Sequence, residues 1–219
     1  VVVGPYDLPH DYKYYGEEKD GNHDRAAGQM IVDACNAADV DIDFTEFDTD
    51  NDGIIDNVFV YYAGHNQAEG ASANTIWPHR SYISSKILCD GVRLYDYACT
   101  SEFRGADGEE MCGIGTFCHE FGHVLGLPDL YITDYESNHN TPGRWDIMDQ
   151  GSYNNKGRTP PTYSSYSRFF LGWLKPIQIT GGSYTLNPLI ESNEAYLFAM
   201  EDHNLNGKSP DPVEFFMIE

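Results

Sequence analysis

Hydrophobic and polar positions along this chain of 219 residues predict a protein of mixed helices and strands. Apolar residues recur at helical spacing over residues 24–38, with Asp24 as the expected N-cap. Cys35 joins that apolar stripe, which indicates a buried thiol. The dense apolar run 57–63 predicts a buried strand and residues 92–99 predict a second one, with mostly loop around ASANTIWPHR between them.

The second half of the chain predicts a helix, a long loop and several strands. A helix is expected over 113–125, because this segment shows helical spacing without proline and meets Gly126, a typical left-handed cap. Residues 129–159 are rich in Asn, Asp and Gly and predict a loop. Two prolines then open a helix near 162–171, stopped by Gly172. The rest, with SYTLNPL, AYLFAM and EFFMIE, alternates like strands.

Charge and hydropathy narrow the classes of partner. The chain has 35 acidic residues against 13 Lys and Arg, a formal net charge of −22. Such a field repels phosphate backbones and anionic lipid headgroups, so neither nucleic acid nor membrane partners are expected. No apolar run approaches the roughly 18 residues that a membrane span needs, and the first residues do not form a signal peptide. The 41% hydrophobic content suffices for one domain with a real core.

The cysteines give information about the cellular compartment but not about the fold. Their number is odd and no C-x-x-C pair is present, so a zinc ribbon is not indicated. One or two disulfides are compatible with export, and their pairing does not follow from the sequence. The five are Cys35, Cys89, Cys99, Cys112 and Cys118.

Candidate chemistry is concentrated in the predicted helix and the turn after it. His119 and His123 are four residues apart, so on a helix both project from one face and can bind one zinc ion. Glu120 then points toward the open position of the metal, where it can act as general base. A catalytic zinc site needs a third protein ligand, and Asp129 follows beyond the turn that Gly126 allows.

The length of this motif makes chance an unlikely source. For this composition H-E-x-x-H alone has a chance expectation of about 2%, and the added Gly and Asp lower it to roughly two in ten thousand. The full string, H-E-x-x-H-x-x-G-x-x-D within HEFGHVLGLPDLY, resembles the immune-inhibitor-A-like family of bacterial secreted metallopeptidases. YYAGHNQAEG, TIWPHR, RWDIMDQGSY and SRFFLGWLKP also match that family, and the likeness covers roughly residues 55–180.

The resemblance implies a function and a set of site residues. Such enzymes are metzincin-type zinc endopeptidases in which an aspartate, here Asp129, replaces the usual third histidine, and Met148 corresponds to their methionine turn. It also implies calcium stabilisation, protein or peptide substrates, and a secreted or cell-surface location in a bacterium. Where several metzincins place a catalytic tyrosine this chain has Gln150, so Tyr153 is expected to serve packing. His79 of WPHR is expected to be structural.

The fold implied by the resemblance is α+β and zincin/metzincin-like. A mixed sheet with the active-site helix would be followed by a lower lobe with a methionine turn and a strand-rich C-terminal part. One catalytic domain over 1–219 is expected, with an upper lobe about 1–126, a lower lobe about 127–180 and a tail 181–219. Both ends of the chain are apolar runs that read as interior strands, so the domain is expected to be incomplete at both ends, with Val1–Val3 as a strand.

A second metal site is predicted in the acidic run DTDNDGIIDN. Its aspartates and Gly53 occupy positions 1, 3, 5, 6 and 9 of a calcium loop, and a backbone carbonyl occupies position 7. Position 12 is Phe59 rather than the glutamate of an EF-hand. Glu46 or Asp43 would complete the shell, and the alternative is a solvated acidic turn. The expected calcium ligands are Asp48, Asp50, Asp52, the carbonyl of Ile54, and Asp56.

Two other readings use the same residues. A gluzincin-type site would take its third ligand from Glu136 or Glu191, but it would leave Gly126 and Met148 without a purpose. A catalytically silent, metal-dependent binding module would not need Glu120, which is present. The preferred substrate and the oligomeric state do not follow from the sequence.

Overall fold

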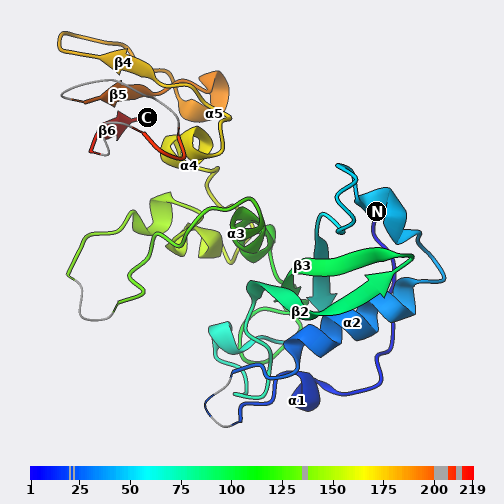
Figure 1. Ribbon diagram of the computed structural model, residues 1–219. Helices are drawn as coiled ribbons and strands as arrows, with labels where there is room; N and C mark the ends of the chain where they lie inside the picture. Colours follow the sequence, from blue (N-terminus) through cyan, green and yellow to red (C-terminus); the bar gives the residue numbers. More distant parts are fainter. Residues whose placement is uncertain (20, 22, 135–137, 200–206, 211–213) are drawn as a thin grey trace. The chain divides into compact units, whose positions relative to one another are not determined.

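The computed structural model describes residues 1–219 except 20, 22, 135–137, 200–206 and 211–213 (Figure 1). The chain forms two compact units, Val1–Val124 and Leu125–Glu219. Each unit combines helices with a three-stranded sheet of mixed direction, which confirms the α+β class. Among the described residues, no helix has both the length and the apolar character to cross a membrane.

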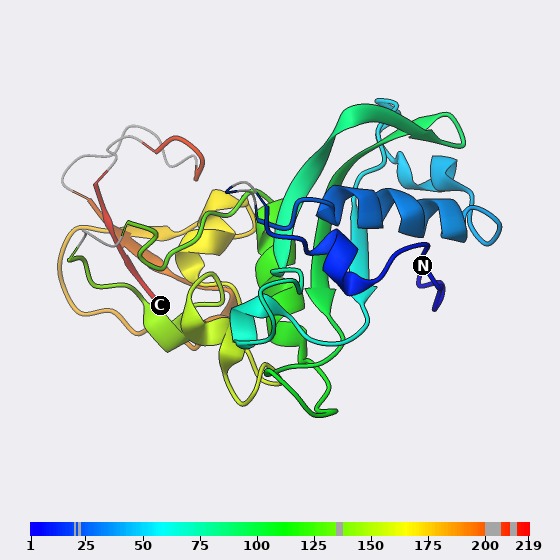
Figure 2. The same ribbon diagram turned by 90° about the horizontal axis from the view of Figure 1, so that it is seen from below.

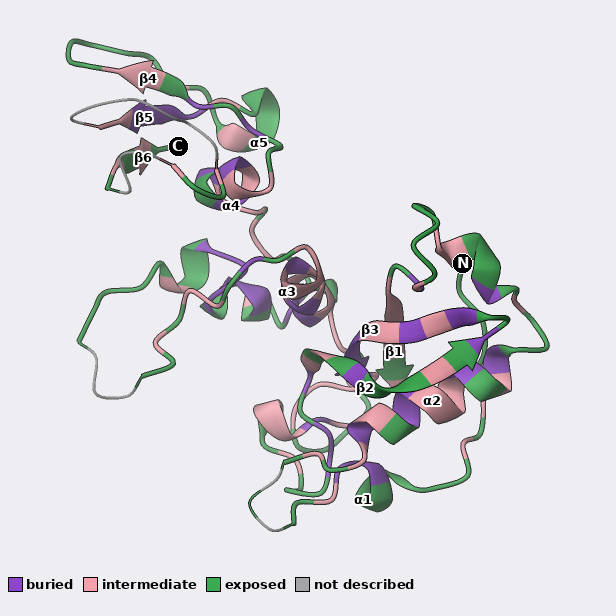
Figure 3. Ribbon diagram, viewed as in Figure 1, coloured by how far each residue is buried: buried purple, intermediate pink, exposed green. Residues whose placement is uncertain are grey.

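The first unit is built on a sheet in the order β1–β3–β2. The central strand β3 pairs in parallel with β1 and antiparallel with β2. Burial is heaviest on β3, as its purple segments show in Figure 3. The unit comprises α1 (Tyr12–Tyr15), α2 (Ala27–Ala38), the 3-10 turn η1 (Phe44–Phe47), β1 (Val58–Tyr62), η2 (Gln67–Glu69), β2 (His79–Cys89), β3 (Val92–Ser101) and α3 (Ile114–Val124).

The expected strands at 57–63 and 92–99 are present as β1 and β3, but β2 was not predicted. β2 and β3 form a hairpin closed by Asp90 and Gly91, both with positive φ (51° and 93°). An Asp-Gly pair with that geometry is a favoured hairpin turn because its twist matches the strands. The Asp90-Gly91 dipeptide is the sequence signal from which the hairpin, and so β2, could have been predicted. β1 is less buried than expected, since Tyr61 is 54% exposed.

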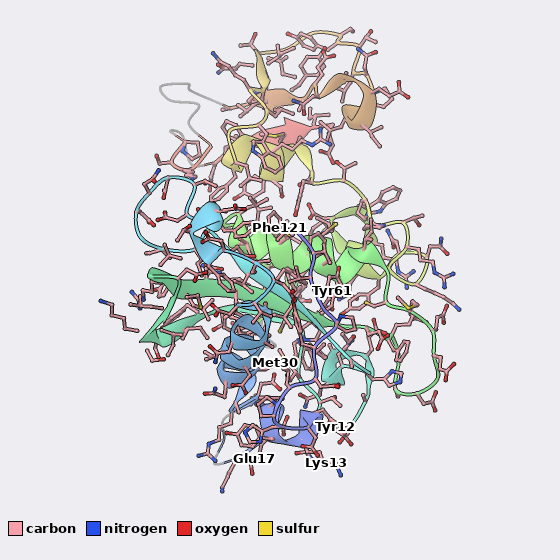
Figure 4. The ribbon with its side chains drawn as sticks, turned by 90° about the vertical axis from the view of Figure 1, so that its right-hand side faces the viewer. Tyr12, Lys13, Glu17, Met30, Tyr61 and Phe121 are labelled. Atoms are coloured by element: carbon pink, nitrogen blue, oxygen red, sulfur yellow. The ribbon has the colours of Figure 1, made fainter. Side chains whose placement is uncertain are left out.

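Helix α2 covers one face of this sheet, beside β2 in Figures 1 and 2. Its buried positions include Ile31 and Cys35, so the predicted apolar stripe and the buried thiol are confirmed. Met30, labelled in Figure 4, belongs to the same buried set. The helix lies close to the strand at Gly28, where an added Cβ would meet the Ile83 Cδ1 atom at 3.3 Å. The N-cap of α2 makes no side-chain hydrogen bond, so packing against the sheet is expected to supply much of the stability of this helix.

The N-terminus predicted for α2 was wrong. Asp24 is not the N-cap: it has φ 48°, the helix begins at Ala27, and Ala26 occupies the cap position. The Asp24 carboxylate instead accepts a hydrogen bond from the Trp77 backbone N–H at 3.0 Å, a partner 53 residues away. Val1–Val3 was also misread, because it forms no strand and Val2 is 98% exposed.

The second unit contains a sheet in the order β4–β5–β6, parallel between the first pair and antiparallel between the second. AYLFAM and EFFMIE supply β5 and β6, as expected, whereas SYTLNPL forms no strand. The helix expected near 162–171 begins at Ser165, because the Ser164 side chain caps it. The elements are η3 (Gly143–Trp145), η4 (Gln150–Tyr153), α4 (Ser165–Phe170), β4 (Ile177–Ile179), α5 (Leu189–Ser192), β5 (Tyr196–Phe198) and β6 (Phe216–Ile218).

Candidate metal centre

The helix that carries the motif is α3, Ile114–Val124, one residue shorter at each end than predicted. It packs against β3 and is followed by Gly126, whose φ of 98° confirms the expected left-handed turn. The rings of His119 and His123 lie with their centroids 4.8 Å apart and nearly perpendicular, at 87°. The four-residue spacing on one helical face produces this approach. Glu120, between them in sequence, is buried, with 6% of its surface exposed.

The predicted third ligand lies with the two histidines. His119, His123 and Asp129 each offer one ligand atom, and these atoms all lie within 4.8 Å of one another. Two imidazole nitrogens and one carboxylate oxygen are the donor types and the number of protein ligands that a catalytic zinc site uses. The donor set therefore fits zinc, and all three side chains are only partly buried, which leaves solvent access.

The segment that carries Asp129 is fixed on both sides. Leu127 is buried before it, and the backbone N–H of Leu130 after it donates to the Met148 carbonyl at 2.9 Å. Met148 itself has no exposed surface. A backbone hydrogen bond thus links Met148, of the predicted methionine turn, to Leu130, which directly follows the predicted third ligand.

Two buried carboxylates shape the turn at Met148. Asp146 Oδ1 accepts from the Met148 N–H at 2.8 Å, and Asp149 accepts from Gly143 N–H at 2.6 Å and from Gln150 N–H at 2.7 Å. Both acids are at most 3% exposed, so backbone donors satisfy them in place of water. Sequence reasoning did not single them out, although the D-I-M-D spacing offered a signal.

Glu136 and Glu191 were the alternative candidates for the third ligand. Glu136 lies outside the described residues. Glu191 is exposed in the first turn of α5 and does not belong to the group of three ligand atoms formed by His119, His123 and Asp129. Tyr153 is 40% exposed at the end of η4.

Two further histidines of the quoted segments have hydrogen-bonding roles. His79 joins the Trp77 carbonyl through Nδ1 (2.6 Å) and the Tyr97 hydroxyl through Nε2 (2.9 Å), which agrees with the structural role expected for it. His65 Nδ1 lies 3.2 and 3.0 Å from the carbonyls of Arg104 and Gly105, so it carries the proton there. Sequence reasoning gave His65 no role.

A ring cluster connects α3 to β1. Phe59 and Tyr61 on β1 contact Phe117 on α3, with centroids 4.6 and 6.1 Å from it, and Phe121 continues the stack at 5.8 Å from Phe117. Figure 4 labels Tyr61 and Phe121 on these two elements. These contacts help to hold the orientation of the helix that carries both histidines.

The acidic loop gathers three of its four predicted carboxylate ligands. Ligand atoms of Asp48, Asp50 and Asp52 lie within 4.8 Å of one another. Asp48 also accepts from the backbone N–H groups of Asp52 (2.9 Å) and Gly53 (3.0 Å), which curls the loop around its carboxylate. Asp56 lies outside this group and accepts from the Thr49 hydroxyl at 2.7 Å.

The surroundings of the loop differ from an EF-hand. Ile54 forms an isolated bridge with Arg93, so the loop leads into the sheet. Of the two acids considered for completing the shell, Asp43 caps η1 by accepting from Thr45 N–H at 2.9 Å. Glu46 lies in that same short turn and is exposed.

Comparison with known proteins decides the family. Residues 1–181 match the family model described as immune inhibitor A peptidase M6, catalytic domain. The chain belongs to the immune inhibitor A peptidase M6 family. The family resemblance expected from the motif is thereby confirmed, and so is the class of metallopeptidase that its members represent.

Two curated relatives of this peptidase family have names that agree. Pre-pro-metalloprotease PrtV of Vibrio cholerae serotype O1 is 27% identical over 195 residues, which cover 78% of this chain and 21% of the relative. Immune inhibitor A of Bacillus thuringiensis subsp. alesti is 28% identical over 191 residues, covering 71% of this chain and 27% of the relative. The chain thus spans about a quarter of the length of these relatives.

Proposed function

We propose that this chain is the catalytic domain of a zinc metalloendopeptidase that hydrolyses peptide bonds in protein substrates. The observation that carries the proposal is the group of His119, His123 and Asp129 ligand atoms within 4.8 Å of one another, with Glu120 next to the first of them. Membership of a peptidase family supports the reaction class. Both observations are needed, because a fold family alone does not define an active site.

Each ligand has a defined role in the proposed site. His119 and His123 would bind through neutral imidazole nitrogens and Asp129 through one carboxylate oxygen, which leaves a net charge of about +1 and one open position. When bound, zinc lowers the pKa of a coordinated water toward about 7 and polarises the scissile carbonyl. The partial burial of the three ligands limits competing water while the site stays reachable by a peptide.

Glu120 is proposed as the proton carrier. Its carboxylate takes a proton from the attacking water and then delivers that proton to the leaving amine. Only 6% of Glu120 is exposed, so bulk water does not compete freely for this proton. A glutamate adjacent to a zinc-binding histidine on one helix is the residue type and position that this chemistry uses.

We further propose that the enzyme is of the metzincin type, with Met148 as its methionine turn. Met148 is fully buried and accepts a backbone hydrogen bond from Leu130. Both observations favour a role in which Met148 stabilises the segment that carries Asp129. The bacterial relatives and the metallopeptidase class favour an exported protein, secreted or at the cell surface. The net charge of −22 argues against nucleic acid as a partner.

Calcium is proposed as a structural ion of the loop at Asp48, Asp50 and Asp52. Their oxygens are hard donors of the kind calcium prefers, and three carboxylates this close repel one another unless a cation neutralises them. In this proposal the Ile54 carbonyl and Asp56 complete the shell after Asp56 leaves Thr49. The ion would stabilise the entry into β1 and take no part in hydrolysis.

The test is peptide hydrolysis by the zinc-loaded protein at constant calcium. A zinc-selective chelator should abolish cleavage of an unstructured protein substrate, and added zinc should restore it. A protein that holds one zinc per chain but cleaves none of a broad peptide library would support the silent binding module instead. Cleavage that persists in metal-free protein would remove zinc from the reaction.

A further inference from the structure

Two of the five cysteines meet inside the core of the first unit. Cys35 lies in the last turns of α2 and is 3% exposed. Cys89 is the last residue of β2 and is 6% exposed. Both belong to the same cluster of buried residues, although 54 positions of sequence separate them. Nothing in the proposed hydrolysis uses either thiol.

The packing of α2 on β2 brings the two cysteines into the same part of the core. The helix lies against the strand at Gly28, where the Ile83 side chain approaches closely, and reaches the end of the strand two turns later at Cys35. Figures 1 and 2 both show α2 alongside this hairpin. The two thiols are close enough for each to influence the pKa of the other, so their side chains are neighbours in this core.

We propose that Cys35 and Cys89 form a disulfide in the exported protein, tying α2 to the turn end of the β2–β3 hairpin. The oxidant is a small-molecule or protein disulfide of an oxidising compartment. One cysteine thiolate attacks a sulfur of that disulfide and releases a thiolate; the second then attacks the mixed disulfide and releases the other. Two protein thiols each lose one hydrogen, and the oxidant is reduced to two thiols.

Burial dictates when this bond forms. Desolvation raises the pKa of the Cys35 thiol to about 12, and desolvation together with the charges of Asp39 and Asp90 raises the pKa of Cys89. The thiolate is the reactive form, so exchange in the closed core is slow. The disulfide therefore forms while α2 is still docking onto the hairpin. Once buried, it is protected from reductants for the same reason.

The surroundings of two other cysteines differ. The Cys99 sulfur lies 3.7 Å from His79 Nδ1, and Cys112 lies near the side chains of Thr100 and Thr116. Neither contact is a thiol pair. We therefore expect Cys99 and Cys112 to remain reduced when Cys35 and Cys89 are linked.

The cross-link acts on the scaffold of the zinc-binding helix. It joins α2 to the strand pair whose second member, β3, packs directly against α3. A covalent tie also restricts the unfolded chain, which raises the free energy of unfolding. The expected effect is therefore on stability, with little change in the intrinsic rate of hydrolysis at moderate temperature.

The test is disulfide mapping of the full-length protein, both after export and after refolding with a glutathione redox couple. Free thiols are alkylated under denaturing conditions without reductant, and the digest is analysed by mass spectrometry. The expected result is one linked pair of peptides containing Cys35 and Cys89, with Cys99 and Cys112 alkylated. Refolding does not depend on the proposed export or on peptidase activity, so this result stands or falls separately from both.

Variants sharpen the test. Cys35→Ala should make Cys89 fully alkylatable, and Cys89→Ala should do the same for Cys35, whereas Cys118→Ala should leave the linked peptide intact. Reductant should lower the melting temperature of the oxidised wild type but not that of the Cys35→Ala/Cys89→Ala variant. Quantitative alkylation of both thiols in oxidised wild-type protein, or linkage of either to another cysteine, would overturn the proposal without any variant.

Discussion

The backbone N–H of Leu130 donates a hydrogen bond of 2.9 Å to the carbonyl of Met148. This bond connects the segment directly after Asp129 to a turn whose methionine is completely buried. The turn is itself held by the buried carboxylates of Asp146 and Asp149. The position of the proposed third ligand is therefore supported by residues about 20 positions further along the chain, which do not themselves need to touch a metal.

Shortening Met148 should destabilise this arrangement. Met148→Ala removes a fully buried side chain and leaves a cavity, so the free energy of unfolding should fall by about 2–5 kcal/mol. Met148→Leu keeps nearly the same volume and should cost less than about 1.5 kcal/mol. Chemical denaturation of both variants measures the difference. Equal stability of the alanine variant and the wild type would show that the turn does not depend on this side chain.

Replacing Glu120 should separate metal binding from turnover. Glu120→Ala keeps all three proposed ligands, so the protein should still bind one zinc per chain. Turnover should fall by about a hundredfold to ten-thousandfold, because the proton carrier is gone. Zinc content is measured beside peptide cleavage, with the exposed Glu109→Gln as the matched control. Substantial activity in the alanine variant would remove Glu120 from the role of general base.

Replacing Asp129 should have the opposite signature. Asp129→Ala removes one of three protein ligands, and zinc affinity should drop by more than about a hundredfold. Even the mutation of residues that only hydrogen-bond to metal ligands lowers metal affinity by about tenfold to a hundredfold. Activity should be lost together with the metal. Asp107→Asn, at an exposed position, controls for the loss of one negative charge. Retention of zinc at wild-type affinity would show that the third ligand lies elsewhere.

Calcium should stabilise the protein without being needed for the chemistry. Because the unfolded loop has little affinity, calcium at a hundred times its dissociation constant should add about 2.7 kcal/mol to the free energy of unfolding. The melting temperature is measured on calcium-free protein that keeps its zinc, before and after calcium is added. Asp50→Asn should weaken the effect of calcium, whereas Asp7→Asn, at an exposed position outside the loop, should not. A melting temperature that ignores millimolar calcium would count against the site.

Local sequence signals suffice to bring the proposed site residues together because these residues are close in the chain. His119, Glu120, His123 and Asp129 lie within one helix and the turn after it, so their spacing alone specifies a shared face and a sharp bend. The burial of Cys35 and the strands β1 and β3 follow from equally local periodicity.

The errors came from contacts that link distant residues. Asp24 has the residue type of an N-cap, but its carboxylate binds Trp77 N–H instead. Val1–Val3 has strand propensity, yet propensity does not supply a neighbouring strand. The pairing of cysteines is likewise a tertiary property, and only the packing of α2 on β2 brings Cys35 to Cys89.

The most direct test of the central claim is a crystal structure of the zinc-loaded protein with anomalous scattering recorded at the zinc edge. The account predicts one strong peak, with His119 and His123 nitrogens at about 2.0–2.1 Å and an Asp129 oxygen at about 2.0–2.2 Å. A zinc ion held instead by Glu136 or Glu191 would contradict the proposed ligand set and the metzincin assignment.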